Sequence, residues 1–424
     1  MRENDLDHRS APLVTIINRF YPPDTAPTGT AVQALAMALT AELPTMACVT
    51  VLTTHANYGH ANYGRTPGTT PAGRLPVVER LASLNSARWP PLRLLTTLIE
   101  GRALARRAAA ITGPGVNNVL VTLTDPPLLP LWLAAVAGNR RRVEWTMDLY
   151  PEALAAAGRL SPRSPLYRLL ERGRRAALPD AVLCLGPGQL DFFRARTGFS
   201  GPGFILPAGV IGPGAQIPPC PPPEPLLVYA GNLGEMHRSQ VVAELIERGA
   251  RRGCRVLLAV HGRHAPALRR RLAPLLTGPN PTVLWRNRLS DSEMATATAH
   301  LVTLAGPATH VCVPSKAVTA VCLGRPIIFA GSPDSDVWTV LGRAGWLIAE
   351  QNDGGYCAAE IEAALDGVLD PAAVAARAAA ATELGDRLRE QWRQTVREVA
   401  AWIMASIGLP PKPAWGKPPA SPFF

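Results

Sequence analysis

Short, continuous apolar runs recur along the whole sequence, and helical segments separate them. Runs that are apolar throughout, rather than at alternate positions, are typical of strands buried on both faces of a sheet. Alanine- and leucine-rich stretches such as 28–43 and 239–253 lie between the runs. This alternation predicts βαβ units, so we expect an α/β protein with parallel sheets. The runs are PLVTIIN (12–18), CVTVLTT (48–54), NVLVTL (118–123), RVEWTMD (142–148), DAVLCL (180–185), LLVYAG (226–231), RVLLAVHG (255–262), TVLW (282–285), HLVTLAG (300–306) and PIIFAG (326–331).

A proline-rich stretch interrupts this pattern once. Residues 207–225 read PAGVIGPGAQIPPCPPPEP, and such proline and glycine density cannot continue a helix or a sheet. We therefore expect a hinge between two Rossmann-like domains, over residues 1–206 and 226–382. Residues 383–424 are predicted to form a long amphipathic helix (383–407) and a loose proline-rich tail. A length of 424 residues suits two domains of about 200 residues each.

Composition narrows the class of partner and the compartment. The formal net charge of +11 fits an anionic partner, namely nucleic acid, lipid or a phosphorylated small molecule, and equally fits an arginine-rich composition without functional meaning. Few aromatic residues interleave with basic ones, which disfavours nucleic acid. The seven cysteines lack CxxC spacing, so we expect buried free thiols in a reducing compartment. The polar start MRENDLDHRS does not resemble a signal peptide, and no apolar stretch approaches about 20 residues, which predicts a cytoplasmic protein.

Glycine-containing turns follow two of the predicted strands and open helices. Gly29 and Thr30 begin the helix after the first strand, whereas Gly231 and Asn232 end the strand LLVYA, shortly before His237. Glycine turns at helix N-termini let phosphate approach backbone amides. The second turn matches neither a Walker A loop nor GxGxxG, which argues against a P-loop and against a standard NAD site. An ordinary turn with solvated side chains is the alternative for both.

A lone lysine opens a helix in CVPSKAVTAVCLGRP (312–326). Lys316 follows Ser315 at a strand-to-helix junction, where the helix dipole disfavours a cation. A lysine at such a position is explained by a bound anion beside it. Arg263, at the end of the strand RVLLAVHG, is placed to join it, although an exposed charge is the alternative for that residue.

Carboxylates follow two further strands. Asp148 ends the run RVEWTMD, and ligands of such sheets bind at the carboxyl ends of strands. A turn residue before Pro151 is the alternative. Asp334 and Asp336 form a DxD pair of the kind that binds a metal–diphosphate complex, but helix capping is the simpler interpretation. No histidine pair has zinc spacing, and we expect no metal site.

The stretches DLYPE (148–152), GNLG (231–234) and PSK…GRP (314–326) together resemble the GT-B glycosyltransferases of group 1, family 4, notably the bacterial surface-polysaccharide enzymes. The resemblance implies two Rossmann-like domains that face each other across a cleft. The N-terminal domain would bind the acceptor, the C-terminal domain a nucleotide-sugar, and the last helix would cross back to the first domain. It also implies a retaining hexosyl- or N-acetylhexosaminyltransferase that uses a UDP-sugar donor, a polysaccharide or lipid-linked glycan acceptor, and no metal or other cofactor.

The same resemblance assigns roles to residues. Asp148 would lie near the reacting sugar, and Lys316 and Arg263 would stabilise the departing diphosphate. Arg288 would lie at the nucleobase. Thr319 stands where many relatives carry a ribose-binding glutamate, and it can offer only a hydroxyl there. The expected catalytic residues are Asp148, Lys316 and Arg263, and the expected donor-binding residues are Gly29, Thr30, Gly231, Asn232, His237, Arg288, Ser315 and Thr319.

Two alternative functions and one possible membrane-binding surface are also considered. The missing glutamate fits a catalytically degenerate scaffold subunit of a glycosyltransferase complex. A nucleotide-sugar 2-epimerase shares the two-domain plan, but we would expect more acids and histidines in its cleft. The segments 86–107 and 158–175 interleave apolar residues with arginine, as binding to the inner face of an anionic plasma membrane requires. Solvated helix faces are the alternative.

Overall fold

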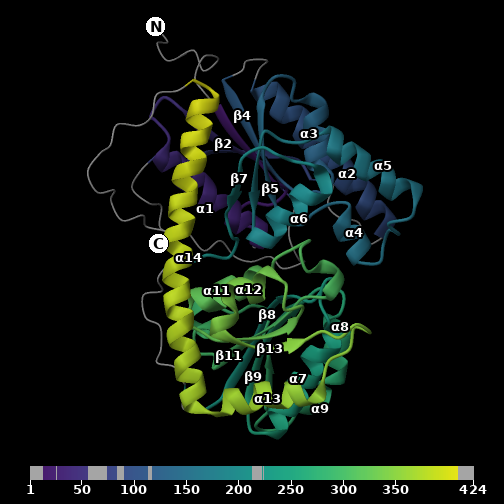
Figure 1. Cartoon of the computed structure of the whole chain (residues 1–424), viewed down its shortest axis with the longest axis vertical. Helices are drawn as coiled ribbons and strands as arrows, with labels where there is room; N and C mark the ends of the chain where they lie inside the picture. The colour runs from purple at the N-terminus through teal and green to yellow at the C-terminus, as the bar shows by residue number, and fades with distance from the viewer. Residues whose placement is uncertain are drawn as a thin grey trace.

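Two α/β domains are stacked along the long axis of the molecule, and one long helix runs beside both (Figure 1). The computed structural model describes residues 13–24, 26–55, 74–83, 90–112, 117–212, 222 and 224–408, with the backbone alone for 90–94. The predicted N-terminal polar segment, most of the proline-rich hinge with Cys220, and the C-terminal tail lie outside the described residues.

Each domain is built on one parallel sheet, as expected. The first sheet has seven strands in the order β3-β2-β1-β4-β5-β6-β7, and the second has six in the order β10-β9-β8-β11-β12-β13. The strands of the first are β1 (Leu13–Ile17), β2 (Cys48–Thr54), β3 (Val77–Leu81), β4 (Asn118–Leu123), β5 (Arg141–Thr146), β6 (Ala181–Cys184) and β7 (Gly203–Ile205). Those of the second are β8 (Leu226–Asn232), β9 (Arg255–His261), β10 (Val283–Trp285), β11 (Ala299–Thr303), β12 (Ile327–Gly331) and β13 (Gly345–Ala349).

All ten apolar runs form strands, and three further strands were missed. The missed strands β3, β7 and β13 each lie at an edge of a sheet. An edge strand is covered on fewer sides, so its sequence need not be apolar throughout. In β3, for example, Val77 and Val78 are exposed. The continuous-apolar pattern therefore detects every central strand but only one of the four edge strands, β10.

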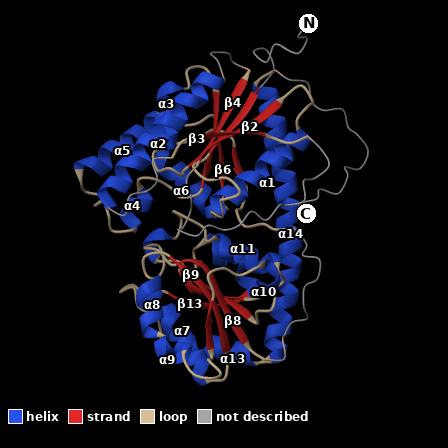
Figure 2. Cartoon of the chain, turned by 180° about the vertical axis from the view of Figure 1, so that it is seen from behind, coloured by secondary structure: helices blue, strands red, loops and turns tan. Residues whose placement is uncertain are grey.

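Helices cover both faces of each sheet (Figures 1 and 2). The predicted helices 28–43 and 239–253 appear as α1 (Pro27–Glu42) and α7 (Ser239–Arg251). The other helices of the first domain are α2 (Pro90–Ile111), α3 (Leu129–Val136), α4 (Glu152–Ala156), α5 (Pro165–Ala176) and α6 (Pro187–Thr197). Those of the second are α8 (Ala265–Arg271), α9 (Ala273–Leu276), α10 (Asp291–Met294), α11 (Ser315–Cys322), α12 (Asp336–Leu341), α13 (Ala358–Leu369) and two 3-10 turns, η1 (Gly306–Ala308) and η2 (Gly342–Ala344).

The last helix belongs to both domains. It was expected over 383–407, but α14 spans Pro371–Ser406 and begins where the Asp370 carboxylate accepts a hydrogen bond from the Ala372 amide. Its first half packs against α11 in the second domain, and its second half enters the core of the first domain, where Trp392 is buried. The helix thus crosses back to the first domain, as the resemblance implied. No described helix is long and apolar enough to span a membrane.

Candidate functional site

The two domains meet at the loops that follow the carboxyl ends of their strands. The Leu149 amide, after β5, donates to the Val311 carbonyl at 3.0 Å. Asp148 and Cys312 form an isolated antiparallel bridge, and the Gln189 amide side chain, after β6, also donates to the Val311 carbonyl. Asp148 is therefore placed directly against the segment of the second domain that leads to Lys316.

Lys316 lies in the first turn of α11 and turns back towards the end of β8. Its Nζ donates to the Tyr229 hydroxyl at 2.7 Å and to the Asn232 carbonyl at 3.1 Å, and it lies 4.2 Å from the centre of the Tyr229 ring. Gly231 has a φ of +126°, which favours glycine, and a Cβ there would make ordinary contact with Lys316 Cε at 3.6 Å. Burial lowers the pKa of Lys316 to about 7, so its charge is only half developed at neutral pH.

His237 lies beside this lysine, at the end of the same glycine-containing loop. Its Nδ1 is 2.6 Å from the Thr303 carbonyl oxygen, which can only accept, so Nδ1 carries the hydrogen. Burial, together with the charge of Lys316, lowers the pKa of His237 to about 3. The histidine is thus neutral and presents the unprotonated Nε2 as its other nitrogen. The structure brings together Gly231, Asn232, His237 and Lys316, four of the residues to which the sequence analysis assigned a site role.

A second carboxylate, which sequence analysis missed, lies near Asp148. Asp125 follows β4, the strand adjacent to β5, and the Thr124 hydroxyl accepts a hydrogen bond from the Asp148 amide. Burial raises the pKa of Asp148 to about 6. Burial also raises the pKa of Asp125 to about 6; nearby Arg19 opposes this shift and the charge of Asp148 adds to it. The site thus holds two carboxyl groups whose protonation changes near neutral pH.

Arg263 makes no described contact with Lys316, which it was predicted to join. Its side chain is 72% exposed and forms an ion pair with Glu235, on the loop after β8. Glu235 also accepts from Arg159 of the first domain, with Nε and Oε2 2.5 Å apart. Arg263 therefore reaches the site through a carboxylate that the sequence analysis did not single out.

Gly29, Thr30 and Arg288 make no contact with this centre among the contacts of the described residues. Gly29 is in the first turn of α1, where a Cβ would lie 3.2 Å from the Tyr21 nitrogen, so this glycine permits close packing of the helix against its own preceding loop. Thr30, next to it, is exposed. Arg288 is exposed on the loop after β10, the edge strand.

Thr319 and Ser315 face the start of the segment between the domains. The Thr319 hydroxyl donates to the Gly209 carbonyl at 2.9 Å. Gly209 has a φ of +88°, and a Cβ there would lie 2.5 Å from the Ser315 carbonyl oxygen. Where relatives are expected to hold a ribose through a glutamate, this chain uses its hydroxyl to fasten the interdomain segment to α11.

The Asp-Ser-Asp sequence caps two helices. Ser335 caps its own helix α12 by accepting from the Trp338 amide. Asp336, in the second domain, accepts from the Gly188 and Gln189 amides at 2.7 and 2.8 Å and so caps α6 of the first domain. Capping is thus the role of these side chains in the structure. Among the described residues, no group of three or more His, Cys, Asp or Glu side chains is arranged to hold a metal ion.

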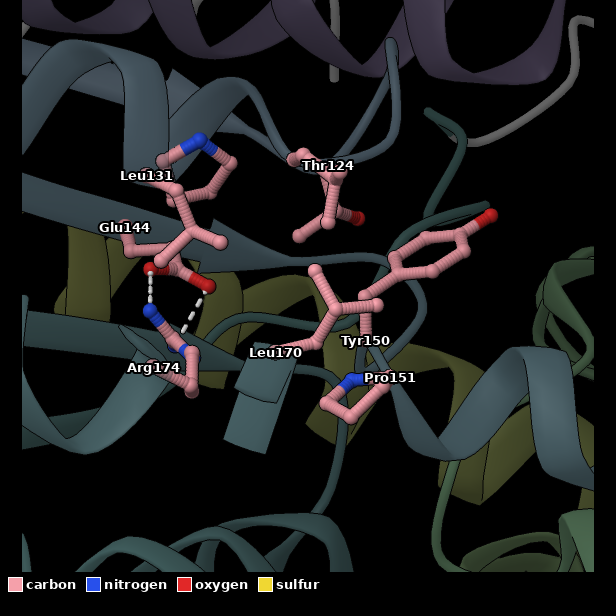
Figure 3. A pocket seen from close by; sticks show the side chains of 9 residues that line it. Thr124, Leu131, Glu144, Tyr150, Pro151, Leu170 and Arg174 are labelled. Atoms are coloured by element: carbon pink, nitrogen blue, oxygen red, sulfur yellow. Dashed lines mark hydrogen bonds and ion pairs between the residues drawn. The ribbon is translucent and has the colours of Figure 1, made fainter. Parts of the chain in front are cut away.

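A small cavity lies behind the Asp148 segment, between α3, α5 and β5 (Figure 3). Its volume is about 10 Å³, which holds at most one water molecule. Glu144 and Arg174 line it and form a buried, two-pronged ion pair with both distances at 2.6 Å. Tyr150 and Pro151 line its other side. The cavity is too small for a sugar or a nucleotide. The ion pair that lines it joins α5 to β5.

Sequence analysis missed several residues of the centre for identifiable reasons. Asp125 follows the run NVLVTL, so its place at a strand end was a usable signal. Tyr229 lies inside an apolar run, and its position in the sequence indicates only a core residue. Cys312 reads as one more buried thiol, yet its backbone pairs with Asp148. Contacts that cross from one domain to the other leave no periodic trace in a sequence.

No protein-family model and no curated protein sequence matches this chain. Solved structures do match nearly its whole length. Sucrose-phosphate synthase from Thermosynechococcus elongatus aligns with a TM-score of 0.65 at 14% identity and covers 93% of this chain and 99% of its own. WaaG, a glycosyltransferase involved in lipopolysaccharide biosynthesis, gives 0.62 at 17% identity, with 92% and 99% covered. HepE from Anabaena, in complex with UDP and glucose, gives 0.60 at 12% identity, with 92% and 99% covered.

Proposed function

We propose that this chain, whose fold is that of the GT-B glycosyltransferases, is itself a glycosyltransferase that takes a sugar from a nucleotide-sugar donor. The observation that carries the proposal is the position of Lys316. It is a half-charged, partly buried lysine at a helix N-terminus, beside a glycine-containing loop. It lies four residues beyond Cys312, whose backbone pairs with that of Asp148 in the other domain.

The lysine cluster is suited to a diphosphate. The N-terminus of α11, the Gly231 turn and Lys316 all favour an anion, and an anion would in turn favour the charged lysine. We assign the donor phosphates to this cluster, UDP as the nucleotide, and the nucleobase to the side of Arg288. In this arrangement Lys316 stabilises the departing diphosphate, and no metal ion is needed for that charge.

Asp148 is assigned to the reacting sugar and the acceptor. Its backbone bridge to Cys312 holds it close to the lysine segment, and its carboxyl group changes protonation near pH 6. We infer a retaining reaction, in which acceptor and leaving group share one face of the sugar. The proposed acceptor is a polysaccharide or a lipid-linked glycan, and the proposed sugar is a hexose or an N-acetylhexosamine.

A panel of nucleotides tests the donor site. UDP, GDP and ADP at 1 mM are added to the protein, and the melting temperature is measured, because a ligand that binds only the folded state raises it. We expect UDP to raise it most and Lys316→Ala to abolish the rise. Arg343→Ala, which changes an exposed cation on η2, is the control and should leave the shift intact. No shift with any nucleotide would refute the enzyme function.

Turnover separates an enzyme from a scaffold. The hydroxyl of Thr319 is used on the Gly209 carbonyl, which is the observation that favours a degenerate, non-catalytic subunit. Release of UDP from UDP-glucose and UDP-N-acetylglucosamine, with and without lipid extracts as acceptor, distinguishes the two. Binding without release from any donor would support the scaffold. Release that Asp148→Asn reduces by about 100-fold or more, with UDP binding retained, would support the enzyme.

The acceptor side of the first domain carries a surface suited to an anionic membrane. Leu166 and Leu169 on α5 are 54% and 63% exposed, and Leu95 and Ile99 on α2 are 53% and 48% exposed. Both helices flank α3 on the same side of the domain (Figures 1 and 2). Exposed arginines accompany them, namely Arg102, Arg106, Arg168 and Arg172. Apolar side chains among cations fit the interface of an anionic bilayer. Of the earlier segment 86–107, residues 86–89 lie outside the described residues.

Flotation with vesicles tests this surface. We expect the protein to float with phosphatidylglycerol-containing vesicles at low salt, and less at 0.5 M salt, because exposed charges are screened. The double variant Leu166→Ser, Leu169→Ser should float several-fold less. Val340→Ser, at an exposed apolar residue of the second domain, is the matched control. Absence of flotation at low salt, or equal losses in both variants, would exclude the membrane surface and leave solvated helix faces.

A further inference from the structure

The carboxylate of Glu235 pairs with one arginine from each domain. It lies three residues beyond Asn232 on the loop that follows β8, and its side chain is only 13% exposed. Arg263, from the loop after β9, and Arg159, from the turn after α4 in the first domain, both pair with it. The side chains of Arg263 and Arg159 are 72% and 56% exposed. One largely buried carboxylate thus forms ion pairs with two arginines whose side chains are mostly exposed to solvent.

The position of this carboxylate is unusual because the loop that carries it belongs to the proposed phosphate site. Hydrogen bonds from Arg159 and Arg263 hold the pKa of Glu235 below its usual range, so it is an anion at neutral pH. Lys316 donates to the carbonyl of Asn232 on the same loop. A carboxylate that accepts from arginines offers them the same kind of oxygen as a phosphate. Two arginines beside the proposed phosphate loop are therefore already paired with a carboxylate of the protein itself.

We propose that Glu235 holds Arg159 and Arg263 in the place of the donor diphosphate, and that the donor displaces it. On displacement both arginines move onto phosphate oxygens, so that Arg159 ties the first domain to the donor. This inference rests on the proposed donor site. Exchange is favourable because an exposed ion pair contributes little, whereas a diphosphate offers more charge and more acceptor oxygens than one carboxylate. Arg159 is then a donor-binding residue that comes from the acceptor domain.

The alternative is that Glu235 is a fixed support that orients Arg263, and the two ideas predict opposite signs. If the carboxylate competes with the ligand, Glu235→Gln frees both arginines and strengthens binding. If it supports them, the same substitution weakens binding. A substitution that merely damages the loop also weakens binding, so a gain in affinity cannot be mistaken for structural damage.

The experiment measures dissociation constants by titration calorimetry at low salt. The probe is whichever of UDP, GDP and ADP binds the wild-type chain most tightly. We expect Glu235→Gln to tighten binding about three- to tenfold, which corresponds to the loss of one or two exposed ion pairs as competitors. Arg159→Gln should weaken binding by a similar factor. Glu224→Gln is the matched control, because Glu224 is also paired with an arginine, Arg255, but at the amino ends of β8 and β9, the end of the strands opposite to the site.

The outcomes separate the inference from the function on which it rests. Tighter binding for Glu235→Gln with unchanged binding for Glu224→Gln supports displacement. Unchanged or weaker binding for Glu235→Gln, while the wild type binds normally, overturns the displacement and leaves the donor site standing. An Arg159→Gln variant that binds like the wild type removes Arg159 from the donor site. If the wild type binds none of the three nucleotides, the proposed function fails and this inference fails with it.

Discussion

At the scale of single residues, the choice of lysine at position 316 is the most informative feature. The sequence contains 43 lysines and arginines, of which only three are lysines, and Lys316 is the single one within the described residues. A chain that uses arginine almost everywhere else has a lysine where the cation is partly buried against Tyr229. Arginine stays charged at any accessible pH, whereas a buried lysine gives up its proton readily. The site therefore has a cation whose charge depends on a ligand.

This property predicts a pH dependence of nucleotide binding. The pKa of Lys316 is lowered to about 7 in the free protein, and a bound diphosphate should raise it towards the usual value near 10.4. Binding then takes up a proton above pH 7, so the dissociation constant of UDP should increase with pH, by at most about tenfold per unit between pH 7 and 9. Calorimetry in that range measures it.

The matched variant is Lys316→Arg, whose side chain remains charged throughout. Its dissociation constant should be nearly independent of pH over the same range, even if its affinity at pH 7 is lower. A wild-type constant that does not change between pH 7 and 9 would contradict the assignment of the diphosphate to Lys316.

At the scale of elements, a helix of one domain is capped by a residue of the other. Asp336 is 3% exposed and accepts from two amides at the start of α6. Gly186 and Gly188 make the approach feasible, because a Cβ at Gly186 would lie 2.4 Å from the Asp336 carboxyl carbon. The Asp336 carboxylate accepts hydrogen bonds from amides that have no partner within the helix, and its negative charge interacts favourably with the positive end of the helix dipole. It therefore fixes the orientation of α6 against the second domain.

Asp336→Ala should destabilise the protein by about 1–3 kcal/mol, since it leaves two sheltered amides without an acceptor. Asp334→Ala, two residues away and exposed, is the control and should stay within about 0.5 kcal/mol of the wild type. Urea unfolding at pH 7 measures both. Equal effects of the two variants would show that the cross-domain cap contributes nothing specific.

At the scale of the whole molecule, α14 packs into the cores of both domains. Its first half adjoins α11 so closely that a Cβ at Gly385 would lie 2.8 Å from the Val321 carbonyl oxygen. Its second half supplies Trp392, Val396 and Ile403 to the core of the first domain. The first domain therefore depends on the end of the chain for part of its core.

Trp392→Ala should cost the first domain about 3–5 kcal/mol, because a large buried side chain leaves a cavity. We expect the calorimetric unfolding trace to separate into two transitions, with the first domain melting earlier. Trp402→Ala, at a partly buried tryptophan of the same helix, should have a smaller effect. A Trp392→Ala variant that is destabilised no more than Trp402→Ala would refute the dependence.

The sequence by itself determined the fold class, the central strands and the presence of a long last helix, and the family resemblance supplied the expectation that this helix crosses back. These features depend on local patterns, namely apolar runs, helix starts and glycine turns, which adjacent residues encode. It also located Asp148 at a strand end, which is where its contact with the second domain forms.

Only the tertiary structure decided which side chains meet across the domains. It paired Glu235 with Arg159, 76 positions away, placed Asp336 on α6, and used the Thr319 hydroxyl on the interdomain segment. It also revealed the edge strands β3, β7 and β13 and the start of α14. Such contacts depend on how two independently patterned domains are oriented, and orientation is set by packing between them. The sequence pattern carries no record of that packing. Which charged residues pair with one another could therefore be seen only in the folded chain.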